Sequence, residues 1–363
     1  MSMPMIPAAK PVIGDEERAA VDRVLRSGMI AQGPEVAAFE KEFSEQLVGG
    51  RTCVAVSSGT SGLHLGLLAA GIGPGDEVIV PSFTFAATAN SVALAGATPV
   101  FADIDPLTFC LDAASVEAAI TDRTAAIMPV HLYGHPADMT ALGAVAAKHG
   151  IQLFEDAAQA HGATWQGAPV GSLGAFGLFS LYPTKNMTSA EGGMVSCATP
   201  DLVRMIKLLR NQGMERRYDN EVVGFNARMT DVHAAIGRVQ LGKLPAWTAQ
   251  RQANAAFLSA NLQGVGVPTV APGATHVWHQ YTIRVPHDRD GFTKALAEEY
   301  GVGSGVYYPI PNHLLPSFGL EVDLPVTATA CAEVVSLPVY PALTSEQLER
   351  IVAAVNAVAK AGA

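Results

Sequence analysis

One lysine of this chain lies in a setting that favours chemistry. Lys185 comes after an apolar run that ends at Ser180, and a second short apolar run begins at Met194. The Pro, Thr, Ser and Gly residues between these runs are typical of a loop with a fixed backbone. A lysine beside apolar strands loses part of its charge by desolvation, which suits it to Schiff-base formation. The alternative is an ordinary solvated lysine in a loop. Which of the two applies depends on whether other residues of the chain form a site around Lys185.

Two adjacent carboxylates, Glu155 and Asp156, close another apolar strand, which begins at Ile151. An unpaired carboxylate is costly to bury, so one of the pair is expected to face a ligand and a positive partner that keeps it ionised. We predict that Asp156 takes this place and that Glu155 points to the other face of the sheet. The reverse assignment stays open, as does a simple role for Asp156 as a helix N-cap.

A turn of small polar residues gives a third candidate. The strand Thr52–Val56 passes through Ser57-Ser-Gly-Thr-Ser-Gly62 directly into an apolar helix. Small residues let the backbone approach a ligand, and the free N–H groups at a helix start attract an anion. Ser58, Gly59 and Thr60 are therefore predicted to bind a phosphate, although an ordinary N-cap has the same signature. The segment is neither a Walker loop nor a Gly-x-Gly-x-x-Gly fingerprint.

The elements that position these residues alternate along the first half of the chain. Short apolar strands separated by helices predict an α/β fold with a mostly parallel sheet sandwiched by helices. In such sheets ligands bind beyond the carboxyl ends of the strands. That rule selects five places, which are Ser58–Thr60, Ser82–Phe85, Val130–His135, Asp156–His161 and Ser180–Lys185. The predicted strands are 52–56, 77–80, 98–102, 124–128, 151–155, 174–180 and 194–197, and the predicted helices are 15–27, 35–48, 63–70, 84–94, 113–120, 139–149 and 200–210.

The last third of the chain has a different pattern. We predict one helix over Val232–Leu241 and a second, opened by Pro245, that reaches about Leu262. A strand over 277–285, a helix over 292–300 and a C-terminal helix over 345–358 follow. These elements predict two domains: a large domain, 1–245, which includes an N-terminal helical segment, and a smaller α+β domain, 246–363.

Composition excludes several classes of protein. Of the 363 residues, 49% are hydrophobic and 15% are charged, which excludes a disordered chain. The formal net charge of −10 argues against a nucleic-acid or anionic-membrane partner. The four cysteines are far apart and form no Cys-x-x-Cys pair, so reduced thiols are expected. Without a signal peptide or a run of ~18 apolar residues, the sequence predicts a soluble cytoplasmic protein. His131 and His135 have no third ligand nearby, so no metal site is expected.

Together the five places supply what pyridoxal 5′-phosphate (PLP) requires. Its aldehyde needs an amine, here Lys185, and its ring nitrogen needs a carboxylate that keeps it protonated, here Asp156. Its phosphate needs backbone N–H groups and hydroxyls, which the Ser58–Thr60 turn and Ser180 offer. Its ring face can stack on an aromatic side chain such as Phe85. PLP is therefore the predicted cofactor.

Five segments of the chain also occur in an order that a known enzyme family shares. They are Pro81-Ser-Phe-Thr-Phe-Ala-Ala-Thr88, Glu155-Asp-Ala-Ala-Gln-Ala-His-Gly162, Ser180-Leu-Tyr-Pro-Thr-Lys-Asn186, Glu191-Gly-Gly-Met194 and Gly224-Phe-Asn-Ala-Arg-Met-Thr-Asp231. This series resembles the DegT-type sugar aminotransferases, which are fold-type-I PLP enzymes. The resemblance covers nearly the whole chain and implies the α/β fold of that class.

The resemblance implies roles for single residues. Lys185 would carry the cofactor and move a proton between the cofactor carbon and the substrate carbon, and Asp156 would pair with the ring nitrogen. Gln159 would lie near the 3-hydroxyl group of the cofactor, and Phe85 would stack on its ring. Phosphate contacts are implied for Gly59, Thr60 and Ser180.

The resemblance also implies a partner subunit and a substrate region. Asn226 matches a phosphate contact donated by the neighbouring subunit, so a homodimer with shared active sites is implied. Tyr307, Tyr308 and His313 match the segment that borders the nucleotide-sugar site. Gln212 departs from the family pattern, because many relatives have histidine there. This difference bears on which substrate is bound rather than on the type of reaction.

The resulting hypothesis is a PLP-dependent aminotransferase. L-Glutamate would give its amino group to keto carbon C3 or C4 of a nucleotide-linked keto-deoxysugar, and 2-oxoglutarate would leave. A PLP-dependent dehydratase on the same scaffold is the nearest alternative, but members of that type carry histidine in place of Lys185. A non-catalytic PLP-binding regulator is a second alternative, which the acidic charge balance disfavours. A nicotinamide-dependent oxidoreductase lacks its glycine fingerprint here.

Overall fold

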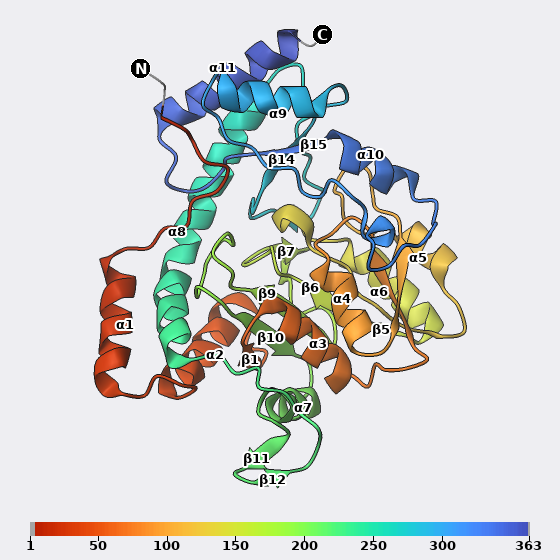
Figure 1. Ribbon diagram of the computed structural model, residues 1–363. Helices are drawn as coiled ribbons and strands as arrows, with labels where there is room; N and C mark the ends of the chain where they lie inside the picture. Colours follow the sequence, from red (N-terminus) through yellow and green to blue (C-terminus); the bar gives the residue numbers. More distant parts are fainter. Residues whose placement is uncertain (1–3, 362–363) are drawn as a thin grey trace.

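The computed structural model describes residues 4–361, most of which surround a twisted central sheet (Figure 1). A parallel bridge between Val130 and Asp156 joins the two halves of this sheet. Neighbouring strands are parallel except for one, Gly193–Cys197, which runs against both of its neighbours. The predicted mostly parallel α/β sheet is therefore confirmed. Across the sheet the strands are β3 (Thr98–Ala102), β2 (Glu77–Pro81), β4 (Thr124–Ile127), β5 (Gln152–Leu153) with its continuation β6 (Glu155–Asp156), β9 (Phe176–Ser180), β10 (Gly193–Cys197) and β1 (Cys53–Val56).

The central strands are apolar because both faces of the sheet are covered. In β2, Val78 and Val80 pack into one core cluster, whereas Ile79 packs into the cluster on the opposite face. Continuous burial of this kind is the pattern expected for parallel strands between two layers of helices. One face is covered by α3 (Gly59–Ala69), α4 (Ala87–Leu94) and α7 (Pro200–Arg210). The other is covered by α2 (Pro34–Leu47), α5 (Ala113–Ala119), α6 (Met139–His149) and α8 (Asp231–Asn261), with α1 (Asp15–Ser27) packed on α8.

One helix prediction is wrong in a specific way. The two helices expected around Pro245 are a single helix, α8, that contains the proline (Figure 1). A proline inside a helix removes one backbone hydrogen bond. Here packing on both sides of the proline offsets that loss, because Leu241 and Leu244 lie in the core beside α2, and Ala255 and Leu258 lie in the C-terminal core. Tertiary contacts have overridden the local signal.

A separate C-terminal core lies beyond the middle of α8. Its apolar residues come mainly from α8 and from four elements that follow, β14 (Tyr281–Arg284), α9 (Arg289–Glu298), β15 (Val334–Leu337) and α11 (Ser345–Ala361). Ile6 also belongs to this core, through a bridge to Val302. A second core is what a C-terminal domain requires, but the predicted boundary at 245 falls inside one helix. The division into two domains stays a prediction.

Smaller elements complete the chain. Like these elements, β15 and the helix α10 (Pro325–Glu333) have no counterpart among the predicted elements. In the described range, 4–361, the structure contains no helix that is long and apolar enough to cross a membrane. The remaining short elements are η1 (Leu132–Gly134), β7 (Thr164–Trp165), β8 (Ala168–Pro169), β11 (Met214–Arg216), β12 (Asp219–Asn220), β13 (Ala274–Thr275) and η2 (Asn312–Leu314).

Candidate active site

A cavity of about 620 Å³ lies beyond the carboxyl ends of the central strands. Its volume is within the range of about 300–1,000 Å³ that is usual for small-molecule sites. Each of the five places selected from the sequence contributes at least one residue to its wall. The predicted site residues that line it are Ser58, Gly59, Thr60, Phe85, Asp156, Gln159, Ser180, Lys185, Tyr307 and Tyr308.

Asp156 is 4% exposed, and donors orient both oxygens of its carboxylate. Thr88 Oγ1 donates to Oδ2 over 2.8 Å, and the N–H of Ala158 donates to Oδ1 over 3.1 Å. Burial raises the pKa of Asp156, while these two donors and the nearby charge of Lys185 act in the opposite direction. A carboxylate oxygen can accept more than one hydrogen bond. The side chain can therefore accept one more donor, such as a protonated ring nitrogen, from the cavity.

The neighbouring carboxylate, Glu155, is fully buried and faces away from the cavity. Its Oε1 accepts from the N–H groups of Leu173 and Gly174, each over 2.7 Å. Its Oε2 accepts from the N–H of Gly171 over 2.6 Å and pairs with Nε2 of His131 over 3.0 Å. All the acceptor positions of Glu155 are thus used to hold the loop before β9. The structure resolves the alternative left open by the sequence in favour of Asp156 as the cavity carboxylate.

Lys185 lies in the loop between β9 and β10, with its side chain in the cavity wall. Burial lowers the pKa of its amine to about 8, and the charge of Asp156 acts against that shift. An ordinary lysine is protonated almost completely at neutral pH, whereas this amine has an appreciable neutral fraction. Only the neutral amine is a nucleophile, so the setting suits Schiff-base formation.

The start of α3 forms another part of the wall. Ser58 caps this helix, because its Oγ accepts from the N–H of Ser61 over 3.1 Å. The first N–H groups of the helix, from Gly59 and Thr60, have no partner within the helix and border the cavity. A Cβ at Gly59 would lie 3.1 Å from Cβ of Ser180, so a side chain there would be crowded and glycine favours this close approach. The N-cap is therefore present, and the free N–H groups beside it are compatible with the phosphate role, which stays a prediction.

Gln159 and two aromatic rings form a further part of the wall. The Oε1 of Gln159 accepts from the N–H of Tyr133 over 2.7 Å, and its Nε2 donates to the hydroxyl of Tyr308 over 3.1 Å. The ring of Phe85 lies 6.2 Å from the ring of Tyr308 and is 59% exposed. A large apolar ring left open in a cavity is available to stack on a planar ligand.

Comparison with known proteins shows the family to which the chain belongs. Residues 11–356 match the DegT/DnrJ/EryC1/StrS aminotransferase family. The chain belongs to this family. Two relatives share 41% identity with it: a "Pleiotropic regulatory protein" of Geobacillus stearothermophilus, with 97% of each chain covered, and the "dTDP-3-amino-3,4,6-trideoxy-alpha-D-glucose transaminase" of Streptomyces venezuelae, with 96% of this chain and 93% of the relative covered.

Solved structures of DegT/DnrJ/EryC1/StrS proteins have the same fold. The crystal structure of DesV from S. venezuelae, in complex with a ketimine intermediate, is 42% identical, with 95% of each chain covered and a TM-score of 0.91. Spr1654 of Streptococcus pneumoniae, in its PLP form, is 29% identical, with 99% of this chain and 100% of that chain covered and a TM-score of 0.93. The present DegT/DnrJ/EryC1/StrS protein is therefore a PLP-dependent transaminase of the fold-type-I class.

The residues of this DegT/DnrJ/EryC1/StrS member fit PLP. The backbone at Gly59 lies close to Ser180, and the free N–H groups beside it suit a phosphate. Asp156 would bind the ring nitrogen and Lys185 the aldehyde carbon. Gln159 presents its amide nitrogen rather than its oxygen to the cavity, because its oxygen is held by Tyr133. It would therefore donate to the ring oxygen of the cofactor.

Two predicted site residues do not line the cavity. Asn226 is exposed, and it forms a β-bridge with Asn211. Exposure is compatible with a contact to another subunit, and its role stays a prediction. His313 is buried, and its Nδ1 lies 2.7 Å from Oγ of Ser82. That hydrogen bond holds the ring away from the cavity wall formed by Tyr307 and Tyr308, so a substrate contact of His313 gains no support from its position.

The sequence did not indicate several residues of the wall. Thr88 lies four residues after Thr84, and its hydroxyl donates to the carboxylate of Asp156. The spacing of these two threonines is a local signal that could have suggested a donor at this place. Glu191, His279 and Gln280 also line the cavity, and His279 and Gln280 come from a segment about 95 residues beyond Lys185. Only the fold brings that segment to the site.

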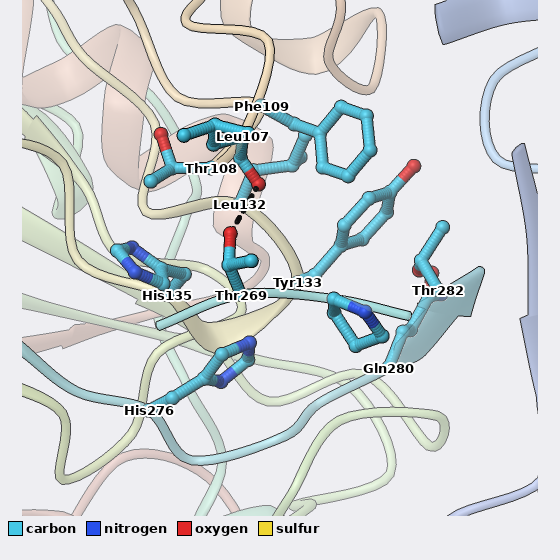
Figure 2. A pocket seen from close by; sticks show the side chains of 11 residues that line it. Leu107, Thr108, Phe109, Leu132, Tyr133, His135, Thr269, His276, Gln280 and Thr282 are labelled. Carbon is cyan, nitrogen blue, oxygen red and sulfur yellow. Dashed lines mark hydrogen bonds between the residues drawn. The ribbon is translucent and has the colours of Figure 1, made fainter. Parts of the chain in front are cut away.

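His131 and His135 are held by hydrogen bonds within the fold. Nε2 of His131 contacts Glu155, and Nδ1 of His131 accepts from the N–H of Ala137, so the fold engages both ring nitrogens. Among residues 4–361 no cluster of three potential metal ligands occurs. A second cavity, of about 10 Å³, lies between His135, His276 and Tyr133 (Figure 2). That volume is about the size needed for one water molecule, so the cavity is no substrate site.

Proposed function

We propose that this transaminase moves the amino group of L-glutamate to keto carbon C3 or C4 of a nucleotide-linked keto-deoxysugar. The observation that carries the proposal is that Asp156 and Lys185, whose amine has a lowered pKa, line the same cavity. The relative from S. venezuelae, whose name specifies a 3-amino sugar, supports amination at C3. Lysine at position 185 argues against the dehydratase alternative.

Each residue has a defined task in this proposal. PLP, when bound, supplies an electron sink for the bonds to the reacting carbon. Lys185 takes a proton from the amino-donor carbon and returns it, which its amine can do because its pKa of about 8 lies near neutral pH. Asp156 keeps the ring nitrogen protonated. The start of α3 binds the phosphate, and Phe85 covers the ring, so that the reacting bond is held in one orientation.

We also propose a homodimer in which Asn226 of one subunit reaches the phosphate in the other. Its exposure supports this role. In the described part of the chain, Lys185 is the only lysine or arginine that lines the cavity. A cavity that takes an anionic cofactor and an anionic nucleotide sugar needs more positive charge or more donors than that. We further propose a cytoplasmic location, since all four cysteines are free and buried.

The test is the visible absorption spectrum of the purified protein before and after L-glutamate is added. A visible cofactor band that bleaches with glutamate, together with release of 2-oxoglutarate, is the expected result. Lys185→Ala should fold but show no such band. A cofactor band that glutamate does not change would refute glutamate as the donor. Product analysis with C3-keto and C4-keto nucleotide sugars then decides the position, and no turnover of either sugar would refute the proposed substrate class.

A further inference from the structure

The hydroxyl of Tyr308 is a hydrogen-bond donor whose direction is fixed by its neighbours. Two hydrogen bonds set this direction, and they begin at the backbone of Tyr133. The N–H of Tyr133 can only donate, so the Gln159 atom that lies 2.7 Å from it is the amide oxygen Oε1. The amide nitrogen Nε2 of Gln159 therefore faces the hydroxyl oxygen of Tyr308, 3.1 Å away, and donates to it.

The hydrogen of the Tyr308 hydroxyl cannot point to Gln159, because an amide nitrogen has no acceptor. Within residues 4–361 no hydrogen bond donated by this hydroxyl is found, and Tyr308 lines the cavity. Burial raises the pKa of Tyr308, the charge of Asp156 acts in the same direction, and the bond from Gln159 acts against them. The hydroxyl therefore keeps its hydrogen at neutral pH. An oxygen atom of a ligand in the cavity is the acceptor that this arrangement suits.

Contacts around Tyr308 hold the donor in one place. The hydroxyl of Tyr133 donates to the carbonyl of Tyr307, so Tyr133 and Gln159 support the same segment from two sides. Tyr133 has a φ of +57°, which is a strained conformation for a large side chain. The centroid of the Tyr308 ring lies 6.2 Å from that of Phe85. Strain that is kept by several contacts is typical of a functional site, and a donor that is already ordered costs little to order when a ligand binds.

A transaminase site must take two different substrates in turn. L-Glutamate has a carboxylate on its reacting carbon, whereas the carbons beside the keto group of a sugar carry only neutral oxygen groups. An arginine that paired with the carboxylate would become an uncompensated buried charge once the sugar was bound. Among the residues that the structure describes, no arginine lines this cavity. A neutral hydroxyl, in contrast, can donate to a carboxylate and to a sugar oxygen alike.

We propose that the hydroxyl of Tyr308 is a donor that both substrates share. It donates to the carboxylate on the reacting carbon of the amino donor and, in the other half-reaction, to a sugar oxygen beside the keto carbon. Gln159 is the positioning residue for this hydroxyl, because its amide nitrogen directs the hydrogen into the cavity. The inference rests on the function proposed above, with L-glutamate as the donor and a ketosugar as the acceptor of the amino group.

The experiment compares the holoenzymes of wild type and Tyr308→Phe, which loses the hydroxyl and keeps the ring. 2-Methylglutamate has no hydrogen to lose from its reacting carbon, so its Kd can be measured by titration of the cofactor band. This Kd should rise about tenfold or more, because a hydrogen bond to a charged group is lost. The KM for the ketosugar should rise about threefold to tenfold, because a bond between neutral groups is weaker. Tyr281→Phe, which loses a hydroxyl that lies 2.8 Å from Ser259 in the C-terminal core, is the control and should change neither value.

A second amino donor locates the contact. 4-Aminobutyrate has no carboxylate on its reacting carbon, so Tyr308→Phe should react with it as fast as wild type does. Equal losses of rate with 4-aminobutyrate and L-glutamate would overturn the proposal, and a loss for only one of the two substrates would overturn the shared role. Weaker binding of PLP with an unchanged Kd and KM would assign the hydroxyl to the cofactor, and this outcome also overturns the proposal.

A structural measurement keeps the test decisive if Tyr308→Phe does not fold. In a crystal structure of the wild-type holoenzyme with 2-methylglutamate, the hydroxyl oxygen of Tyr308 should lie about 2.7 Å from a carboxylate oxygen on the reacting carbon. A distance above about 4 Å would overturn the proposal. A wild-type cofactor band that L-glutamate does not change would refute the proposed amino donor itself, a separate result that needs no variant.

Discussion

Exchange of Glu155 for glutamine should destabilise the protein far more than exchange of its neighbour Asp156 for asparagine. In Glu155→Gln, the amide oxygen can replace Oε1 and still accept from Leu173 and Gly174. The amide nitrogen must then face two other donors, the N–H of Gly171 and Nε2–H of His131. Nδ1 of His131 already accepts a backbone N–H, so this ring cannot change its tautomer to help.

Two buried donors are thus left without an acceptor in Glu155→Gln. Each such donor costs about 1–3 kcal/mol, so the free energy of unfolding should fall by roughly 2–6 kcal/mol. Asp156→Asn differs because its amide oxygen can accept from the N–H of Ala158 while its amide nitrogen donates to the hydroxyl of Thr88. A hydroxyl can reverse its role whereas a backbone N–H cannot. The expected loss for Asp156→Asn is therefore about 1 kcal/mol or less.

Urea unfolding of the two apoproteins, followed by circular dichroism, measures these changes in stability. The glutamate half-reaction, followed by absorbance, measures function. Asp156→Asn should react slower by orders of magnitude, because an amide does not keep the cofactor ring protonated, whereas folded Glu155→Gln should retain most of the wild-type rate. The reasoning fails if Glu155→Gln unfolds within about 0.5 kcal/mol of wild type, or if both variants lose equal stability.

Three further changes test other parts of the site. Gly59→Ala brings a methyl group against Ser180, so PLP binding by fluorescence titration should weaken about tenfold or more, and unchanged affinity would exclude the cradle. Asn226→Ala and Lys185→Ala proteins should each have little transaminase activity alone and should regain part of it when mixed. If subunits are shown to exchange and no activity returns, a shared site is contradicted. Burial lowers the pKa of His161 from 6.5 to about 3, so this ring binds a proton only when the chain unfolds, and it costs stability as the pH falls from about 6.5 towards 3. His161→Phe should therefore flatten the loss of stability, about 1.4 kcal/mol per pH unit, in acid denaturation curves, and an unaltered slope would contradict the buried neutral ring.

The sequence alone determined the order of the main strands and helices over residues 15–210, because apolar runs and turn residues are local signals that survive without tertiary information. It also placed Lys185, Asp156 and the Ser58–Thr60 turn beyond strand ends, and parallel topology brings those ends together. The site residues predicted PLP, and the resemblance to a family supplied the transaminase activity; the comparisons confirm both.

The tertiary structure decided what depends on contacts between distant segments. Only the loop at Gly171–Gly174 shows that Glu155 serves the fold and Asp156 the cavity, because two adjacent carboxylates have the same local signal. Only packing on both sides of Pro245 makes α8 one helix. His279 reaches the cavity through contacts with Gly134, Arg251 and Asn186, which are far from it in sequence. The spacing of residues along the chain indicates which of them are neighbours within one helix or strand. The partner of a buried polar group, in contrast, is fixed by the fold.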